Sequence, residues 1–155
     1  MVIYFLRHAD AEADQDSDFN RKLTPKGLAQ AEKVAKFCVR NGLLPNVILS
    51  SPVLRARQTA EILGQSTSVS PTLVDWLACG MEPVTLLQEI KAIQDKNNIF
   101  LVGHEPDFST SIAALIGHPD PSAIIVKKAS LTAVDMVWIE SGTGSIQFSI
   151  PVTLM

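Results

Sequence analysis

The sequence predicts an α/β fold, a three-layer α/β/α sandwich with a largely parallel central sheet and a C-terminal antiparallel strand or hairpin. Two observations predict it. Short apolar runs alternate with segments of helical periodicity, as expected of parallel strands linked by helices. The last part of the chain instead holds two strand-like segments joined by a turn-rich link. Because no linker or low-complexity segment divides the 155 residues, we expect a single domain over 1–155.

Three expected strands are apolar and β-branched along their whole length rather than at alternate positions. They are residues 2–6, 47–50 and 99–103. Continuous apolar character is typical of parallel strands that helices cover on both faces. We therefore place these three strands at the centre of the sheet.

Four helices are expected, each with apolar residues recurring at helical spacing. A capping residue or proline marks each start, and glycine marks three of the ends. The starts are Thr24-Pro25, Ser51-Pro52, Pro83 and Pro106, and the ends are Gly42, Gly64 and Gly117. In this interpretation Ser51 caps the second helix. Residues 131–139 and 145–150 then form the closing hairpin or antiparallel edge.

The composition indicates an ordinary folded protein. Hydrophobic residues make up 46% of the chain and charged residues 19%, unlike disordered chains, which are charge-rich and poor in apolar residues. No apolar run approaches the roughly 18 residues of a membrane helix. The N-terminal run lacks the length and basic start of a signal peptide, so we expect a cytoplasmic protein.

Charge and cysteine content exclude further classes. The chain has 13 Lys+Arg against 16 Asp+Glu, a net charge of −3, which gives no electrostatic footprint for nucleic acid or an anionic membrane. Its two cysteines, Cys38 and Cys79, are too few for a disulfide framework, and we expect buried thiols. Function has to come from local groups of residues.

Basic and imidazole side chains follow all three central strands. Arg7 and His8 follow the first, Arg55 lies in the opening turn of the helix after the second, and His104 follows the third. In open α/β sheets, ligands bind outside the carboxyl ends of the strands. We therefore expect these four residues to meet at one rim of the sheet.

This set of residues suits phosphoryl transfer. Arginine binds phosphate oxygens with a permanently charged, bidentate fork, and a helix N-terminus adds free N–H groups. A neutral imidazole can attack phosphorus, and a charged one can donate to phosphate oxygens. Each Arg-His or Gly-His pair alone is weak evidence, but their joint placement at strand ends favours a phosphoryl site.

Four ordered segments resemble the histidine phosphatase (phosphoglycerate mutase-like) superfamily. Leu6-Arg7-His8-Ala9 is similar to its first histidine signature, and residues 50–60 are similar to its second arginine motif. Residues 23–31 and 102–106 are similar to its Leu-Thr-x-x-Gly-x-x-Gln-Ala segment and second histidine motif. The short chain resembles in particular the SixA-type phosphohistidine phosphatases, which lack long recognition insertions.

The resemblance implies a role for each of the four residues. His8 would be the nucleophile that becomes phosphorylated, Arg7 and Arg55 would clamp the phosphate, and His104 would donate to its oxygens. Water would then release the phosphate. The scheme implies no metal and no cofactor. The implied substrate is phosphohistidine on a signalling protein.

Two other residues are candidates at the edge of this site. Glu82 lies where larger relatives place a general acid, but it is equally suited to stabilise the first turn of the helix that begins at Pro83. If Glu82 is the acid, a phosphatase for small phosphate esters is the alternative function. Arg21 is a candidate for substrate contact at the rim. A third alternative is a catalytically idle module that docks phosphorylated proteins.

Acidic residues alternate along the segment after His8. They are Asp10, Glu12, Asp14, Asp16 and Asp18. Such a run is most simply a solvated acidic loop. The functional alternative is a rim that attracts a basic partner surface or repels small polyanions.

Overall fold

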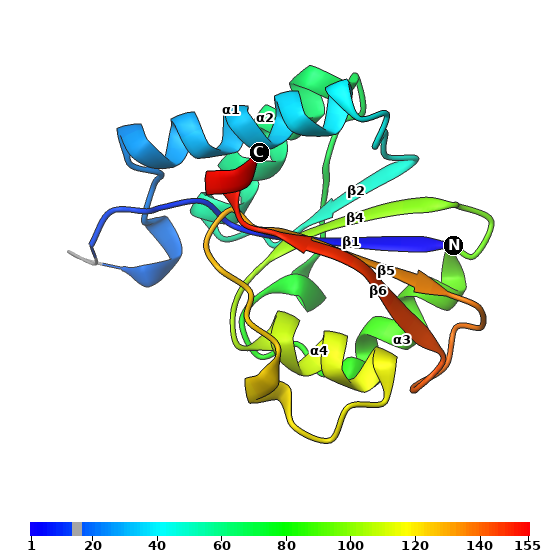
Figure 1. Cartoon of the computed structure of the whole chain (residues 1–155). Helices are drawn as coiled ribbons and strands as arrows, with labels where there is room; N and C mark the ends of the chain where they lie inside the picture. The colour runs from blue at the N-terminus through cyan, green and yellow to red at the C-terminus, as the bar shows by residue number, and fades with distance from the viewer. Residues whose placement is uncertain (14–16) are drawn as a thin grey trace.

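A six-stranded mixed sheet forms the centre of the computed structural model, which describes residues 1–13 and 17–155 (Figure 1). The strand order is β3-β2-β4-β1-β5-β6. The strands are β1 Val2–Arg7, β2 Val47–Ser50, β3 Thr72–Leu73, β4 Asn98–Gly103, β5 Leu131–Met136 and β6 Gly144–Ile150. The helices are α1 Pro25–Arg40, α2 Leu54–Thr67, α3 Pro83–Ala92 and α4 Asp107–Ile116, with short 3-10 helices η1 Asp18–Asn20, η2 Asp75–Leu77, η3 Pro121–Ala123 and η4 Val152–Leu154.

The pairing of the strands confirms the predicted fold class. β4 lies between β1 and β2 and is parallel to both, whereas β5 is antiparallel to β1 and β6 is antiparallel to β5. Arg7 pairs with Gly103, and Ser50 pairs with Val102. The three central strands therefore end at nearly the same level, which brings the residues that follow them to one edge.

Helices cover both faces of the sheet. In Figure 1, α1 and α2 lie on one face and α3 and α4 on the other. Side chains along β1 point alternately to the two faces of the sheet. Tyr4 and Leu6 pack in the apolar cluster under α1 and α2. Ile3 and Phe5 pack in the cluster under α3 and α4. This double burial explains why the central strands are apolar at every position.

Helix α1 begins where the sequence predicts. The Thr24 hydroxyl accepts a hydrogen bond from the Gly27 N–H at 3.0 Å, and proline occupies the first helical position. Gly27 also allows a close approach, because a Cβ atom there would overlap the carbonyl oxygen of Asp10. The start of α1 is thus packed directly against the segment that follows His8.

Helix α2 differs from the prediction at both ends. It begins at Leu54 with Val53 as its N-cap, so the assignment of the cap to Ser51 is wrong. It also continues beyond Gly64 to Thr67. A Cβ atom on Gly64 would lie 2.7 Å from the Val69 carbonyl oxygen, so this glycine permits a tight return of the chain rather than ending the helix.

Smaller corrections concern the second half of the sheet and one thiol. β5 ends at Met136 rather than at residue 139, and Val137 and Trp138 are exposed. The two-residue strand β3 was too short to be predicted from a pattern. Cys38 is buried as expected, but Cys79 is exposed.

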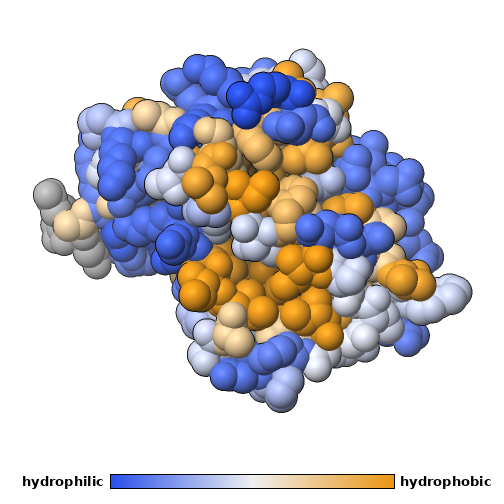
Figure 2. All heavy atoms as spheres, in the orientation of Figure 1, coloured by the Kyte–Doolittle hydropathy of each residue, from blue (hydrophilic) through white to orange (hydrophobic). Residues whose placement is uncertain are grey.

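The hydropathy of the surface varies across the face shown in Figure 2. Hydrophilic atoms dominate the side where the segment after β1 lies in Figure 1, and hydrophobic atoms gather at the centre of the face. Within the described part of the chain, no helix has both the length and the apolar character needed to cross a bilayer.

Candidate active site

His8 lies directly after β1 and is almost completely buried. Its backbone N–H donates to the carbonyl oxygen of Gly103 at 3.0 Å, which joins the ends of β1 and β4. The ring nitrogen Nδ1 lies 2.8 Å from the carbonyl oxygen of Ala9. Because a carbonyl oxygen can only accept, Nδ1 carries the proton and Nε2 presents a lone pair.

The backbone that fixes this tautomer is itself held by α2. The Ala9 N–H donates to the Thr59 hydroxyl at 3.2 Å, and that hydroxyl donates to the Arg55 carbonyl oxygen at 2.8 Å. The helix that carries Arg55 therefore also positions the acceptor of the His8 proton.

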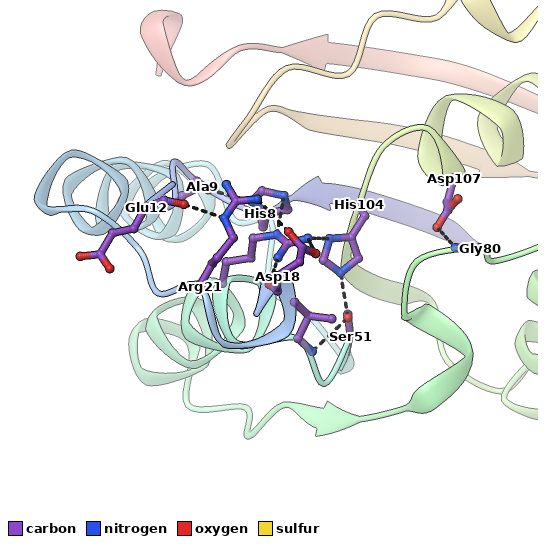
Figure 3. A network of polar contacts seen from close by, with 11 residues as sticks. His8, Ala9, Glu12, Asp18, Arg21, Ser51, Gly80, His104 and Asp107 are labelled. Atoms are coloured by element: carbon purple, nitrogen blue, oxygen red, sulfur yellow. Dashed lines mark hydrogen bonds and ion pairs between the residues drawn. The ribbon is translucent and has the colours of Figure 1, made fainter. Parts of the chain in front are cut away.

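Arg55 connects the two site histidines. It is the second residue of α2, and its side chain is buried. Its Nε–H donates to His8 Nε2 at 3.2 Å, and its Nη2 lies 3.5 Å from His104 Nδ1. The structure thus brings His8, Arg55 and His104 into direct contact. Figure 3 shows the two histidines within the surrounding network.

His104 follows β4 and is 2% exposed. Its ring is tilted relative to that of His8, and the ring centroids are 5.2 Å apart. Its Nε2 lies 2.8 Å from the hydroxyl of Ser51. One edge of the ring therefore faces Ser51, and the other faces Arg55.

Arg7 ends β1 beside His8. Its Nη1 donates to the Val126 carbonyl oxygen at 2.8 Å. Its buried Nε–H has no hydrogen-bond partner among residues 1–13 and 17–155. An unpaired buried donor is unfavourable unless a ligand uses it. Arg7 thus offers an anion a donor that the described residues leave unsatisfied.

Burial keeps both site histidines uncharged. It lowers the pKa of His8 to about 3; the hydrogen bond to the Ala9 carbonyl opposes this shift, and the positive charges of Arg55 and Arg7 add to it. It lowers the pKa of His104 to about 4, assisted by Arg55 and Arg7. Both imidazoles are therefore neutral near pH 7. A neutral ring with an available lone pair is what a histidine nucleophile requires.

Asp18, on η1, contacts the basic centre directly. Arg55 donates from Nη1 to the Asp18 carbonyl oxygen at 2.7 Å and from Nη2 to Oδ2 at 3.1 Å. Arg21 Nη1 donates to Oδ1 at 2.8 Å. Hydrogen bonds from Arg21 and Arg55 lower the pKa of this carboxyl group, so it is an anion at neutral pH and is not a proton donor.

The two edge candidates are placed differently. Arg21 reaches the centre through its ion pair with Asp18, while its Nε donates to the Glu12 carbonyl oxygen at 2.6 Å. Glu82 is exposed and stands at the N-cap of α3 without a side-chain capping bond. Among the described residues, no hydrogen bond or ion pair joins Glu82 to the site. Its role as an acid stays a prediction.

The acidic segment after His8 is paired with basic residues where it is described. Lys128 Nζ lies 2.8 Å from Asp10 Oδ1, and Lys22 Nζ lies 3.6 Å from Glu12 Oε1. Asp14 and Asp16 lie outside the described residues. The picture of a purely solvated loop therefore does not hold for Asp10, which is paired with Lys128, or for Asp18, which is bound to Arg55.

Two contacts of the site were not predicted from the sequence, those of Asp18 and Ser51. Asp18 stands three residues before Arg21, a spacing that suits an ion pair, but the run of acids around it hides this signal. Ser51 follows β2 directly and precedes Arg55, which places a hydroxyl at the predicted edge. Its partner, His104, is 53 residues away, and no local pattern reports that distance.

Comparison with known proteins identifies sequence relatives over most of the chain. The family model of the Histidine phosphatase superfamily (branch 1) matches residues 3–78. An uncharacterized protein of Picosynechococcus sp. (strain ATCC 27264 / PCC 7002 / PR-6) is 34% identical over 95% of this chain and 89% of its own length. The phosphohistidine phosphatase SixA of Escherichia coli (strain K12) is 24% identical over 96% of this chain and 92% of its own.

Solved structures share the fold. The protein histidine phosphatase SixA complexed with tungstate aligns with a TM-score of 0.89 and 23% identity, covering 99% of this chain and 98% of that one. A phosphoserine phosphatase mutant (H9A) from Entamoeba histolytica in complex with phosphoserine aligns with a TM-score of 0.76 and 18% identity, covering 99% and 98%. The same architecture therefore occurs in phosphatases whose names give different substrates.

Proposed function

Because the chain belongs to the histidine phosphatase superfamily, metal-independent hydrolases with a histidine nucleophile, we propose that it dephosphorylates phosphohistidine on a protein through phospho-His8. The observation that carries this proposal is the state of His8. Its ring is buried, neutral and held with Nδ1–H on the Ala9 carbonyl, so that Nε2 faces Arg55 as a lone pair.

In the first step, His8 Nε2 attacks phosphorus, and the bond from phosphorus to the substrate ring nitrogen breaks. If the other ring nitrogen of the substrate carries a proton, the leaving group is a neutral imidazole. The phosphoryl group then moves from one imidazole to another, and no proton has to be supplied. Arg7 and Arg55 balance the charge of the phosphoryl oxygens, and His104 donates to one of them.

In the second step, water attacks the phosphorus of phospho-His8, and the bond between Nε2 and phosphorus breaks. The electron pair returns to Nε2, and both hydrogens of the water stay on the released dihydrogen phosphate. His8 is again neutral, with its proton on Nδ1. The Ala9 carbonyl oxygen can accept the Nδ1 hydrogen bond through both steps, because this bond does not depend on whether Nε2 carries the phosphoryl group.

The proton balance favours phosphohistidine over a phosphate ester. An ester leaves as an alkoxide and needs a general acid within hydrogen-bond reach. The carboxyl group of Asp18, which contacts Arg55, has a lowered pKa and is ionised. Glu82 makes no described contact with the site. Since neither Asp18 nor Glu82 is placed as an acid, a substrate that needs none from these two residues fits better than one that does.

A phosphoryl group that binds both terminal nitrogens of Arg55 competes with Asp18 for them. The Asp18 carbonyl and carboxylate oxygens occupy both terminal nitrogens of the Arg55 guanidinium. Phosphate and carboxylate compete for the same N–H donors. We infer that η1 moves, or that its carboxylate turns away, when substrate binds.

A cytoplasmic location is part of the same proposal. Both Cys38 and Cys79 are free thiols, as is usual in a reducing compartment.

A substrate panel tests this function. Purified protein is incubated with a phosphohistidine-bearing protein, with free phosphohistidine and with small phosphate esters, and kcat/KM is measured for each. We expect the phosphohistidine substrates to turn over fastest. Faster turnover of esters would reject the substrate class and favour a small-molecule phosphatase. Binding of the phosphorylated protein without turnover would favour a docking module.

A further inference from the structure

Ser51 lies against the edge of His104 that faces away from Arg55. Both residues are buried, and the Ser51 hydroxyl is 2.8 Å from His104 Nε2 (Figure 3). The backbone of Ser51 is fixed to the strand that carries His104, because its N–H donates to the Val102 carbonyl oxygen at 2.9 Å. The hydroxyl oxygen also accepts the Val53 N–H at 3.2 Å.

With these contacts, the Ser51 hydroxyl can form a hydrogen bond with His104 whether the imidazole is neutral or charged. A hydroxyl has one proton and two acceptor sites. The Val53 N–H uses one acceptor site. When His104 is neutral with its proton on Nδ1, the hydroxyl can donate to Nε2. When His104 is charged, the remaining acceptor site can receive the Nε2 proton.

The tautomer of His104 decides whether it can bind a phosphoryl oxygen. Its Nδ1 lies on the side of Arg55, 3.5 Å from Nη2, and only a protonated Nδ1 can donate to an anion there. In the free protein the Arg55 N–H, which can only donate, favours the opposite tautomer, with a lone pair on Nδ1. Once a phosphoryl group takes up this Arg55 donor, a hydroxyl that donates to Nε2 keeps the His104 proton on the side of the substrate.

We propose that Ser51 is a positioning residue that holds neutral His104 in the Nδ1–H tautomer and so makes it a donor to the phosphoryl group. The inference rests on the proposed function, in which His104 contacts phosphate. Ser51 does not touch the substrate; it acts through the imidazole. This role replaces the helix-capping role that the sequence favours.

The proposal predicts a change in pH dependence. The charged and titratable groups that face His104 are Arg55 from α2, His8 and Arg7 from the end of β1, and Asp18 from η1. Of these, none is hydrogen-bonded to Nε2. Without the hydroxyl, His104 donates reliably from Nδ1 only when the whole ring is charged, which occurs at lower pH.

Three variants separate positioning from packing. Ser51→Ala removes the hydroxyl, and Ser51→Thr retains one as a conservative rescue. Ser50→Ala is the matched control, because Ser50 is also fully buried but its hydroxyl donates only to the Ser51 carbonyl oxygen at 3.0 Å. All are assayed with the phosphohistidine-bearing protein for kcat, KM and thermal unfolding.

We expect Ser51→Ala to lower kcat roughly 10- to 100-fold near pH 7, the range typical of groups that orient a functional imidazole. The defect shrinks as the pH falls from about 6 towards about 4, where the His104 ring begins to take up a proton. Ser51→Thr recovers most of kcat, and Ser50→Ala stays within roughly threefold of the wild type. A loss in Ser51→Ala that is the same at every pH, or that Ser50→Ala shares, overturns the proposal.

The wild-type protein provides a test that needs no variant. The chain has three histidines, so long-range ¹H–¹⁵N spectra can be assigned with His8→Gln and His118→Asn. With inorganic phosphate bound near neutral pH, His104 should show the Nδ1–H tautomer. A neutral ring protonated on Nε2 contradicts the inference.

Failure of the inference can be told from failure of the proposed function. If His8→Ala retains activity, the proposed mechanism fails whatever Ser51 does. If phospho-His8 forms normally but the tautomer or the pH profile of Ser51→Ala is not as expected, only the role of Ser51 is rejected.

Discussion

Burial of His8 and His104 sets the chemistry of the site and also makes the fold sensitive to acid. In the unfolded chain an imidazole has a pKa near 6.5 and binds a proton as the pH falls below it. In the folded protein the pKa of His8 is about 3 and that of His104 is about 4, so both rings stay neutral until the pH falls to these values. The unfolded state therefore binds more protons in this range, so the free energy of unfolding falls as the pH falls.

We predict that the free energy of unfolding decreases by about 3 kcal/mol between about pH 6.5 and about pH 5, the combined effect of two such groups. Urea unfolding at several pH values measures it. His8→Gln should remove about half of the slope, and His118→Asn, at an exposed histidine outside the site, is the control variant. A slope that does not change in His8→Gln would show that this ring is charged in the folded protein.

The sequence predicted the residues of the site better than their partners. Arg7, His8, Arg55 and His104 follow strand ends, and the topology of α/β sheets is enough to bring them to one edge. Their partners depend on side-chain directions and on contacts between distant segments. Asp18 meets Arg55 across 37 positions, and no periodicity reports such a pair.

η1 is the element that stands between the site and a substrate. Its Asp18 holds Arg55 and Arg21 together, and both arginines would be available to a phosphoryl group once it is displaced. This contact weakens anion binding to the extent that an incoming anion competes with Asp18 for Arg55.

We predict that Asp18→Asn binds inorganic phosphate roughly two- to fivefold more tightly, since a partly exposed ion pair contributes a fraction of a kcal/mol to about 1 kcal/mol. Competitive inhibition of turnover by phosphate measures this affinity. Asp95→Asn is the control, because Asp95 also forms an ion pair, at 2.6 Å with Lys96, on an exposed surface. Unchanged or weaker inhibition in Asp18→Asn would mean that Asp18 supports the anion site rather than competing for it.

Helix ends illustrate the limits of local signals at the level of elements. Thr24-Pro25 marks the start of α1 correctly, because capping is a contact within one turn. Ser51-Pro52 and Gly64 do not mark the ends of α2, because Ser51 and Gly64 each contact a residue outside the helix. The Ser51 hydroxyl binds His104, and Gly64 makes room for the carbonyl of Val69.

The topology of the whole molecule explains why the site lies where it does. β4 is central, with β1 and β2 as its parallel neighbours, so the loops that leave these three strands are adjacent. The alternation of strands and helices predicts the parallel layer, and the turn-rich tail predicts the β5–β6 hairpin. The order of the strands was not predicted, because the sequence pattern does not show on which side of the preceding strand each new strand is added.

The most direct test of the account is to find where the phosphoryl group rests during turnover. The protein is mixed with excess phosphohistidine-bearing protein, quenched in alkaline denaturant, digested and analysed by mass spectrometry. We predict one acid-labile phosphoryl group on the peptide that contains His8, with the same result in His118→Ala and none in His8→Ala. Phosphorylation at another residue, or wild-type turnover by His8→Ala, would contradict His8 as the nucleophile.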